Sequence, residues 1–168
     1  MSTLGTPTFV THAADRRRLL WAGSTVFDLV IGGEQSGGAV SLLDQRGRRG
    51  DVTPLHIHNS EAEIFYVLEG GITAWAGSDV YQIGAGGAVY LPAGQAHAFG
   101  IRTDEARLIT VTAPGGFGDF VSMAGIPVDG DTPTTWDFDP GRIMAAAGQH
   151  DIQIVGPPPD LPEQQRDK

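Results

Sequence analysis

The sequence predicts an all-β protein whose strands close into a sandwich or barrel. Short β-branched and aromatic runs recur along the chain at nearly regular spacing, and glycine or proline separates them. The chain has 24 glycines and 11 prolines among 168 residues, which suits many tight turns. About eight short strands joined by such turns are typical of double-sheet jelly rolls and small barrels.

The predicted strands follow one another from residue 24 onward. Residues 26–31 and 39–43 read as a strand pair, and the glycines between them indicate a flexible connection. The later strands share short runs of β-branched and aromatic residues bounded by turns, and we place them at residues 62–68, 72–75, 80–83, 88–91, 96–101 and 107–112.

Two short helices are predicted after the last strand. Residues 117–124 carry apolar side chains at helical spacing, which indicates an amphipathic helix that covers one end of the barrel. Asp139 is a suitable N-cap and Pro140 suits the first helical position of a second helix. We expect its buried stripe to be Ile143, Met144 and Ala147, and its end to be Gly148.

The length of the chain and the absence of an internal repeat predict a single domain with one barrel unit. We divide it into an N-terminal arm (1–23), a barrel core (24–116), a C-terminal helical segment packed on the barrel (117–156) and a flexible tail (157–168).

Charge and composition exclude several classes of partner. The formal net charge is −9, so the surface repels nucleic acid and anionic membrane surfaces, and we expect neither as a partner. Cysteine is absent, which excludes disulfides and thiolate ligands. The first ten residues do not resemble a secretory leader and no apolar run is long enough to span a membrane, so we expect a cytoplasmic protein.

A metal site is predicted from three histidines and one glutamate. His56 and His58 are two residues apart, so in a strand their side chains point to the same face, about 7 Å apart. A hairpin return can bring the carboxylate of Glu63 beside them, and His97 can close the site if the sheet curls into a barrel. Taken singly, each histidine is more often a core or surface residue than a ligand.

The spacing of these residues resembles that of the cupin superfamily. Gly50-x5-His56-x-His58-x4-Glu63-x6-Gly70 is similar to the first cupin motif (residues 50–70), and Gly86-x5-Pro92-x-Gly94-x2-His97 is similar to the second (residues 86–101). The resemblance implies a cupin double-stranded β-helix, a jelly-roll barrel, with His56, His58, Glu63 and His97 as the metal ligands.

Two details qualify the motif match. Glu61 is a rival for Glu63, but the motif spacing favours Glu63, and we expect Glu61 to face solvent. The second motif commonly ends in asparagine three residues past the histidine, where this chain has Gly100. That position is no ligand in the family, so the departure bears on packing or on the pocket.

The donor set suits one divalent transition metal. Three imidazoles and a carboxylate accept Fe, Mn, Co, Ni, Cu or Zn, and ligand type does not choose among them. Alternation from Glu63 and from His97 places apolar residues on the ligand face, so we predict a substrate pocket lined by Phe65, Val67, Phe99 and Ile101. These four residues would otherwise simply fill a small barrel.

Three outer segments resemble small bacterial one-barrel cupins of the quercetin 2,3-dioxygenase-like kind. They are Gly-Asp-Val-Thr-Pro-Leu-His-Ile-His at 50–58, Thr-Ala-Pro-Gly-Gly-Phe at 112–117 and Ile-Val-Gly-Pro-Pro-Pro at 154–159. In that family a flavonol binds the metal through its 3-hydroxyl oxygen, O2 adds across the central ring, and the ring opens with loss of carbon monoxide. The resemblance implies that Glu63 is the catalytic residue that accepts the hydroxyl proton.

Two other functions remain open from the sequence. The first is an oxygen-independent metal-dependent isomerase, cyclase, dehydratase or decarboxylase. The second is a non-catalytic cupin that binds a small molecule. For any of these we expect a homodimer, with the N-terminal strand around residues 21–31 pairing with or exchanging into a second copy.

Overall fold

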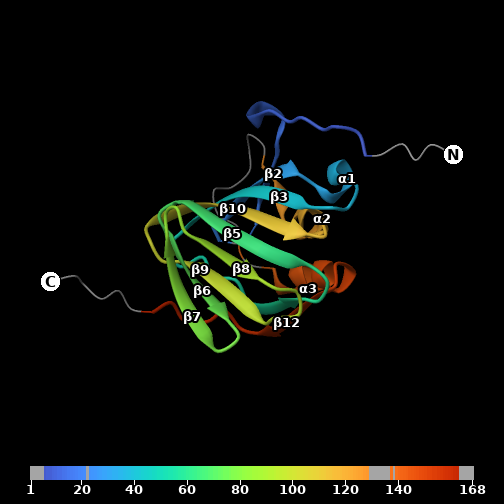
Figure 1. Cartoon of the computed structure of the whole chain (residues 1–168). Coiled ribbons are helices and arrows are strands. Elements are labelled where there is room, and N and C mark those ends of the chain that lie inside the picture. The colour runs from blue at the N-terminus through green and yellow to red at the C-terminus, as the bar shows by residue number, and fades with distance from the viewer. Residues whose placement is uncertain (1–5, 22, 129–136, 138, 163–168) are drawn as a thin grey trace.

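The computed structural model describes residues 6–21, 23–128, 137 and 139–162. Two antiparallel sheets pack face to face as a jelly-roll sandwich, which confirms the predicted all-β class (Figure 1). The larger sheet has seven strands in the order β11-β1-β2-β3-β10-β5-β8. Their bounds are β1 Arg17–Leu20, β2 Val26–Ile31, β3 Ser41–Arg48, β5 Ala62–Glu69, β8 Ala88–Leu91, β10 Glu105–Ala113 and β11 Ile126–Pro127.

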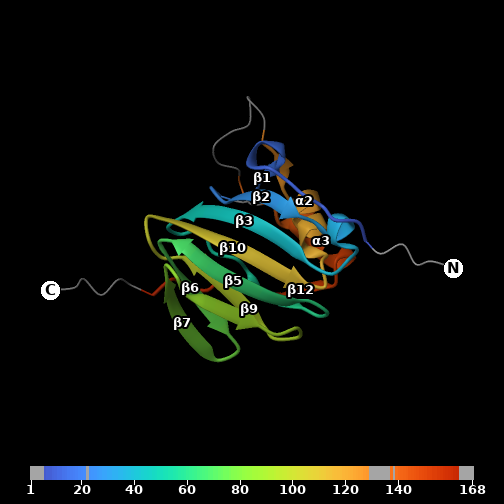
Figure 2. The same ribbon diagram turned by 45° about the horizontal axis from the view of Figure 1, so that its top comes forward.

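The smaller sheet has five strands in the order β12-β4-β9-β6-β7. Their bounds are β4 Leu55–His58, β6 Gly71–Ala76, β7 Asp79–Gly84, β9 His97–Ile101 and β12 Ile152–Gly156. Figure 2 shows β3, β10 and β5 side by side across the larger sheet, with α2 and α3 beside one end of the strands. Chain segments far apart in sequence therefore meet inside the sandwich.

The predicted strands are present, with some differences at their ends. The clearest difference is β3, which was expected to end at residue 43 and continues to Arg48. The second half of β3 consists mostly of polar residues, so the apolar run in the sequence ends before the strand does. Asp44 and Gln45 are nevertheless buried, because Arg107 donates two hydrogen bonds to Asp44 and Thr110 donates one to Gln45.

Both predicted C-terminal helices are present. They are α2 Phe117–Ala124 and α3 Pro140–Gln149, and two short helical turns lie earlier, at Ala13–Asp15 and at α1 Gly33–Ser36. The Asp139 side chain accepts a hydrogen bond from the Arg142 amide, as expected for the N-cap of α3. The predicted stripe of α3 is partly wrong, because Met144 is exposed and Ala146 is buried in its place.

The hydrophobic core consists of two clusters. One lies between the helices and the adjoining strands, and its buried residues include Leu19, Phe27, Leu43, Phe117, Phe120, Val121, Ile143 and Ile152. The other fills the opposite half of the sandwich and includes Phe65, Val67, Ile72, Leu91, Phe99, Ile101 and Leu108. Packing of apolar side chains between the two sheets stabilises the sandwich.

Two glycines near the motifs lie where a side chain would be crowded. Gly70 has φ +72°, and a Cβ there would lie 2.6 Å from Thr103 Oγ1. A Cβ at Gly100 would lie 2.9 Å from a methyl carbon of Val52 and 3.0 Å from one of Leu161. Val52 and Leu161 thus occupy the space that a side chain at residue 100 would need.

The strand expected to pair with a second copy is paired within the chain. β2 hydrogen-bonds to β1 on one side and to β3 on the other, so in the single chain it has no free edge for added pairing, while exchange between two copies stays a prediction. The homodimer itself stays a prediction. Residues 17–20 and 152–156, outside the predicted barrel core, form strands of the two sheets.

The predicted tail, residues 157–168, is described only as far as residue 162. Within the described part of the chain, no helix has the length and apolar character needed to cross a membrane.

Candidate metal centre

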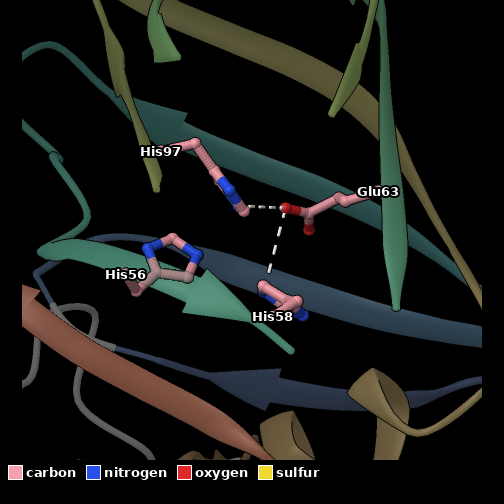
Figure 3. A group of neighbouring side chains, drawn as sticks. All are labelled: His56, His58, Glu63 and His97. Atoms are coloured by element: carbon pink, nitrogen blue, oxygen red, sulfur yellow. Dashed lines mark hydrogen bonds and ion pairs between the residues drawn. The ribbon is translucent and has the colours of Figure 1, made fainter. Parts of the chain in front are cut away.

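The four predicted ligands come together in the interior of the sandwich (Figure 3). His56 and His58 lie on β4, His97 on β9 and Glu63 on β5. One nitrogen or oxygen atom from each residue can be chosen so that all four atoms lie within 4.8 Å of one another. All four side chains are buried. The site therefore joins three histidines of the smaller sheet to one glutamate of the larger sheet.

Strand alternation and register position these side chains. His56 and His58 are the buried residues of β4, while Leu55 and Ile57 are only partly buried. His56 is directly opposite His97 in the β4–β9 pairing, and their ring centroids are 4.4 Å apart. Glu63 points inward because it alternates with the exposed Ile64 on β5.

The outer ring nitrogens of the histidines have hydrogen-bond partners. Nδ1 of His56 lies 2.7 Å from the Pro54 carbonyl oxygen, and Nδ1 of His97 lies 2.8 Å from the Gln95 carbonyl oxygen. A carbonyl oxygen can only accept, so each Nδ1 donates. In the neutral form of each imidazole the Nε2 lone pair is then free for a metal.

The inner atoms fit a metal ion. Nε2 of His58 is buried and has no hydrogen-bond partner among the described residues, so the site holds a polar atom that a metal would satisfy. Oε2 of Glu63 lies 3.1 Å from Nε2 of His97 and 4.0 Å from Nε2 of His58. Two ligands that each bind one ion at about 2.1 Å lie about 3 to 4.2 Å apart, so these separations are compatible with a shared ion.

Burial and mutual charge determine the protonation of the site. Burial, with the nearby His97 and His58, lowers the pKa of His56 to about 3, so that His56 is neutral. Burial opposes the charge on Glu63, but the interactions of its carboxylate with the nearby rings of His97 and His58 outweigh burial and lower the pKa of Glu63. The carboxylate is therefore ionised and the His56 imidazole is uncharged at neutral pH, as metal ligation requires.

Glu61 does not face solvent, and the sequence-based expectation for it is wrong. Its side chain is buried, and Oε2 lies 3.2 Å from Nδ1 of His58. The other oxygen accepts hydrogen bonds from the amides of Gly116 and Phe117. Glu61 is no ligand of the group, yet it contacts one. The sequence could have indicated this burial. Glu61 is two residues before Glu63, and in an extended chain residues two apart point to the same face.

An apolar cavity of about 70 Å³ adjoins the metal site. Its lining includes His56 and Glu63 and a wall of apolar side chains, chiefly Trp21, Phe27, Phe99, Phe117, Phe120, Ile143, Ile152 and Ile154. Of the four predicted pocket residues, Phe99 lines this cavity. The other three, Phe65, Val67 and Ile101, do not line it, although all four belong to the core cluster in the opposite half of the sandwich.

Several of the pocket residues that sequence reasoning missed lie on two helices and an edge strand. Phe117 and Phe120 lie on α2, Ile143 on α3, and Ile152 on β12. The helical spacing of α2 and α3 was visible in the sequence, but the orientation of their apolar faces toward the histidines depends on tertiary packing. His58 and Phe117 show this directly, because their ring centroids are 5.4 Å apart.

Comparison with known proteins supports the motif assignment. Residues 48–112 match the family model described as a cupin domain, and this range contains all four candidate ligands. The chain is 26% identical over 157 residues to the quercetin 2,3-dioxygenase of Bacillus subtilis (strain 168). The match covers 91% of this chain and 46% of that protein, so the chain spans about half the length of this curated relative.

Solved structures show the same fold. KdgF from Halomonas sp. superposes with a TM-score of 0.59 at 14% identity, covering 66% of this chain and 99% of that one. An RmlC-like cupin from Shewanella frigidimarina superposes with a TM-score of 0.58 at 16% identity, covering 68% of this chain and 97% of that one. At these identities the likeness is one of architecture.

Proposed function

Because residues 48–112 match the family model of a cupin domain, we propose that this chain is a metal-dependent dioxygenase that cleaves a flavonol-like or related enolic aromatic compound with O2. His56, His58, Glu63 and His97 hold one divalent transition metal, and the substrate enters the aromatic cavity beside it. The similarity to the Bacillus subtilis quercetin 2,3-dioxygenase supports the choice of reaction.

The observation that carries this proposal is the position of the donor group beside the apolar cavity. Two of the four donors, His56 and Glu63, line the cavity. Most of the remaining lining is aromatic or aliphatic, which suits a planar organic substrate better than a sugar phosphate or a peptide. The oxygen of a substrate in the cavity would thus contact the metal, and its ring would pack against the aromatic wall.

The chemistry needs Lewis acidity and a nearby base. A bound divalent metal would supply the Lewis acidity, which lowers the pKa of an enolic hydroxyl group. Glu63 is ionised and faces the cavity, so its carboxylate can accept the hydroxyl proton. The apolar wall excludes water from the resulting anion. One O2 would be consumed for each flavonol, with carbon monoxide as the second product.

The size of the cavity sets a condition on substrate entry. About 70 Å³ is several times smaller than the roughly 300 Å³ at the lower end of pockets that bury drug-sized ligands. A flavonol can therefore enter only if part of the wall moves. The wall side chains from α2 and α3 are the natural candidates, because these helices lie beside one end of the strands (Figure 2).

The test is oxygen uptake by apo protein reconstituted separately with Fe, Mn, Co, Ni, Cu and Zn, in the presence of quercetin. We expect uptake with at least one metal, together with loss of the visible absorbance of the flavonol and release of carbon monoxide. His97→Ala, which removes one ligand, is expected to abolish the uptake. The Glu69→Gln variant, altered at an exposed end of β5, serves as the control.

The alternative functions give different results in the same assay. Turnover of a substrate without O2 consumption would replace the dioxygenase by an oxygen-independent metalloenzyme. Binding of the flavonol without any turnover, with every metal, would indicate a small-molecule-binding cupin. Either result contradicts the proposal.

A further inference from the structure

Glu61 is a buried carboxylate that the proposed reaction does not use. It lies in the connection between β4 and β5, directly before Ala62, and its side chain is only 6% exposed. Burying a carboxylate is costly unless hydrogen bonds compensate for lost solvation. Its two oxygens make different contacts.

One oxygen contacts a candidate metal ligand. Oε2 of Glu61 lies 3.2 Å from Nδ1 of His58. A carboxylate oxygen accepts, so Nδ1 of His58 donates. In the neutral imidazole the proton then resides on Nδ1, and Nε2, which has no hydrogen-bond partner among the described residues, keeps its lone pair directed into the site.

The other oxygen holds the beginning of α2. Oε1 of Glu61 accepts from the Gly116 amide at 2.6 Å and from the Phe117 amide at 3.0 Å. These amides are at the N-terminus of the helix, where backbone donors have no partner within the helix. Thr112 Oγ1 lies at 3.5 Å from the same oxygen.

Phe117 contacts both His58 and the cavity. Its ring lies 5.4 Å from the His58 ring and forms part of the cavity wall. Glu61 therefore connects a metal ligand and the first residue of the helix that covers the cavity, and both ends of this connection are buried.

We propose that Glu61 is a positioning residue that fixes His58 in the Nδ1–H tautomer for metal binding and ties this ligand to the N-terminus of α2. The inference rests on the proposed metal site but not on the proposed reaction. Carboxylates that orient a metal-binding histidine contribute about 10- to 100-fold to metal affinity or activity in other proteins.

Glu61→Gln tests this role because the amide has nearly the same shape and only one acceptor oxygen. If that oxygen faces the Gly116 and Phe117 amides, the NH2 group faces Nδ1 of His58 and forces the proton onto Nε2. If the amide is reversed, its NH2 group meets two backbone N–H donors. Either arrangement opposes metal binding through Nε2 or disturbs the start of α2.

Two measurements read out the effect without turnover. The first is the Kd for Zn²⁺ or Co²⁺, from titration in competition with a chelator. The second is the tautomer of His58 in the apo protein, from long-range ¹H–¹⁵N NMR spectra at alkaline pH, where the ring is neutral. Glu69→Gln makes the same chemical change at an exposed position and serves as the control.

We expect the Kd of Glu61→Gln to rise about 10- to 100-fold, while that of Glu69→Gln stays within about twofold. We expect His58 to carry its proton on Nδ1 in the wild-type protein and to lose this signature in Glu61→Gln. An unchanged Kd, or a proton on Nε2 of His58 in the wild-type protein, would overturn the proposal.

The wild-type tautomer decides the matter even if the Gln variant fails to fold. It also separates the two proposals. A wild-type chain that binds no metal would remove the proposed function, whereas the tautomer measured in the same apo sample still decides for or against the role of Glu61.

Discussion

At the scale of single residues, the site is organised by the hydrogen bonds on the outer side of each imidazole. Nδ1 of His56 and Nδ1 of His97 each donate a hydrogen bond to a backbone carbonyl, and Nδ1 of His58 donates to a carboxylate. These contacts orient all three Nε2 atoms toward Glu63 before any metal arrives (Figure 3). Preorganisation of this kind lowers the cost of forming the metal site.

His56 makes the stability of the apo protein depend on pH. Its pKa is lowered from 6.5 to about 3 on folding, so between these values the unfolded chain binds a proton that the folded chain does not. Stability is therefore lost as the pH falls below about 6.5. Between about pH 7 and pH 5 this contribution amounts to about 2 kcal/mol, at 1.36 kcal/mol per pH unit.

The measurement is urea unfolding of metal-free wild type and His56→Gln at both pH values. The wild type is expected to lose about 2 kcal/mol more than the variant as the pH falls. His58 acts in the opposite direction, because burial is outweighed by Glu61 and Glu63 and its pKa is raised. His58 is present in both proteins, so the difference between them reports His56 together with its electrostatic coupling to His58 and His97. Equal losses of unfolding free energy in the two proteins would refute the lowered pKa of His56.

Glu63 is expected to be needed for turnover beyond its role as a ligand. With Glu63→Gln, three histidines and an amide oxygen remain to hold the metal, but the amide cannot accept the substrate proton. We expect kcat to fall about 10²- to 10⁴-fold in protein shown by elemental analysis to be metal-loaded. A loaded variant with the wild-type kcat would rule out Glu63 as the base.

Sequence reasoning predicted which four side chains come together better than it predicted the residues that hold them in place. The spacing of His56 and His58 was sufficient because strand alternation is local. Glu63 and His97 came from the motif spacing, which reflects a known fold. Glu61 was misplaced because its environment depends on α2, which begins 56 residues later at Phe117. Local patterns do not report such distant hydrogen bonds.

At the scale of elements, α2, α3 and the edge strand β12 form one side of the cavity wall. The rest of the wall comes from strands and connections that are paired within the sandwich, such as β2, β3 and β9. The two helices pack on each other, α3 also packs on β12 and α2 on the larger sheet, so a shift of one helix would enlarge the cavity. Entry and release of substrate are expected to depend on this shift.

Ile143→Ala tests the wall. Ile143 is 5% exposed and lines the cavity, whereas Met144 on the same helix is 54% exposed and does not line it. We expect Ile143→Ala to cost about 2 to 5 kcal/mol of stability and to lower KM for a flavonol more than KM for a smaller enolic aromatic. Met144→Ala is expected to change stability by no more than about 0.5 kcal/mol.

Urea unfolding and steady-state kinetics with the two substrates provide the readouts. If the Ala variant does not fold, Ile143→Val, with a smaller cost of about 0.5 to 1.5 kcal/mol, replaces it. A KM ratio that is identical in wild type and variant would show that α3 does not limit entry.

The sequence predicted the two helices and the N-cap at Asp139, because capping and helical period are local signals. It placed Met144 in the stripe because an apolar residue was assumed to be buried. A helix turns about 100° per residue, so Met144 points away from the face shared by Ile143 and Ala147. Ala146, three residues after Ile143, occupies that face.

At the scale of the whole molecule, the candidate metal centre joins the two sheets. The histidines belong to the smaller sheet and Glu63 to the larger one, so a bound ion would link them across the core. Any ligand that binds only the folded state stabilises it, by about 2.7 kcal/mol at 100 times its Kd. Metal loading should therefore raise the Tm.

The pairing of the sheets also explains what the sequence could not predict. Alternation correctly placed Phe65, Val67, Phe99 and Ile101 in the interior, but a sandwich has two interior halves. All four belong to the core cluster in the half away from the helices, and of the four Phe99 also lines the cavity. Which half stays open depends on α2, α3 and β12, and no periodicity within a strand contains that information.

The central claim is that these four residues hold one metal ion, and elemental analysis of the purified chain tests it most directly. After loading and dialysis we expect one ion per wild-type chain, and far less in His56→Ala, His58→Ala, Glu63→Ala and His97→Ala variants that remain folded by circular dichroism. A wild-type chain without metal, or folded variants that retain as much metal as the wild type, would contradict the account.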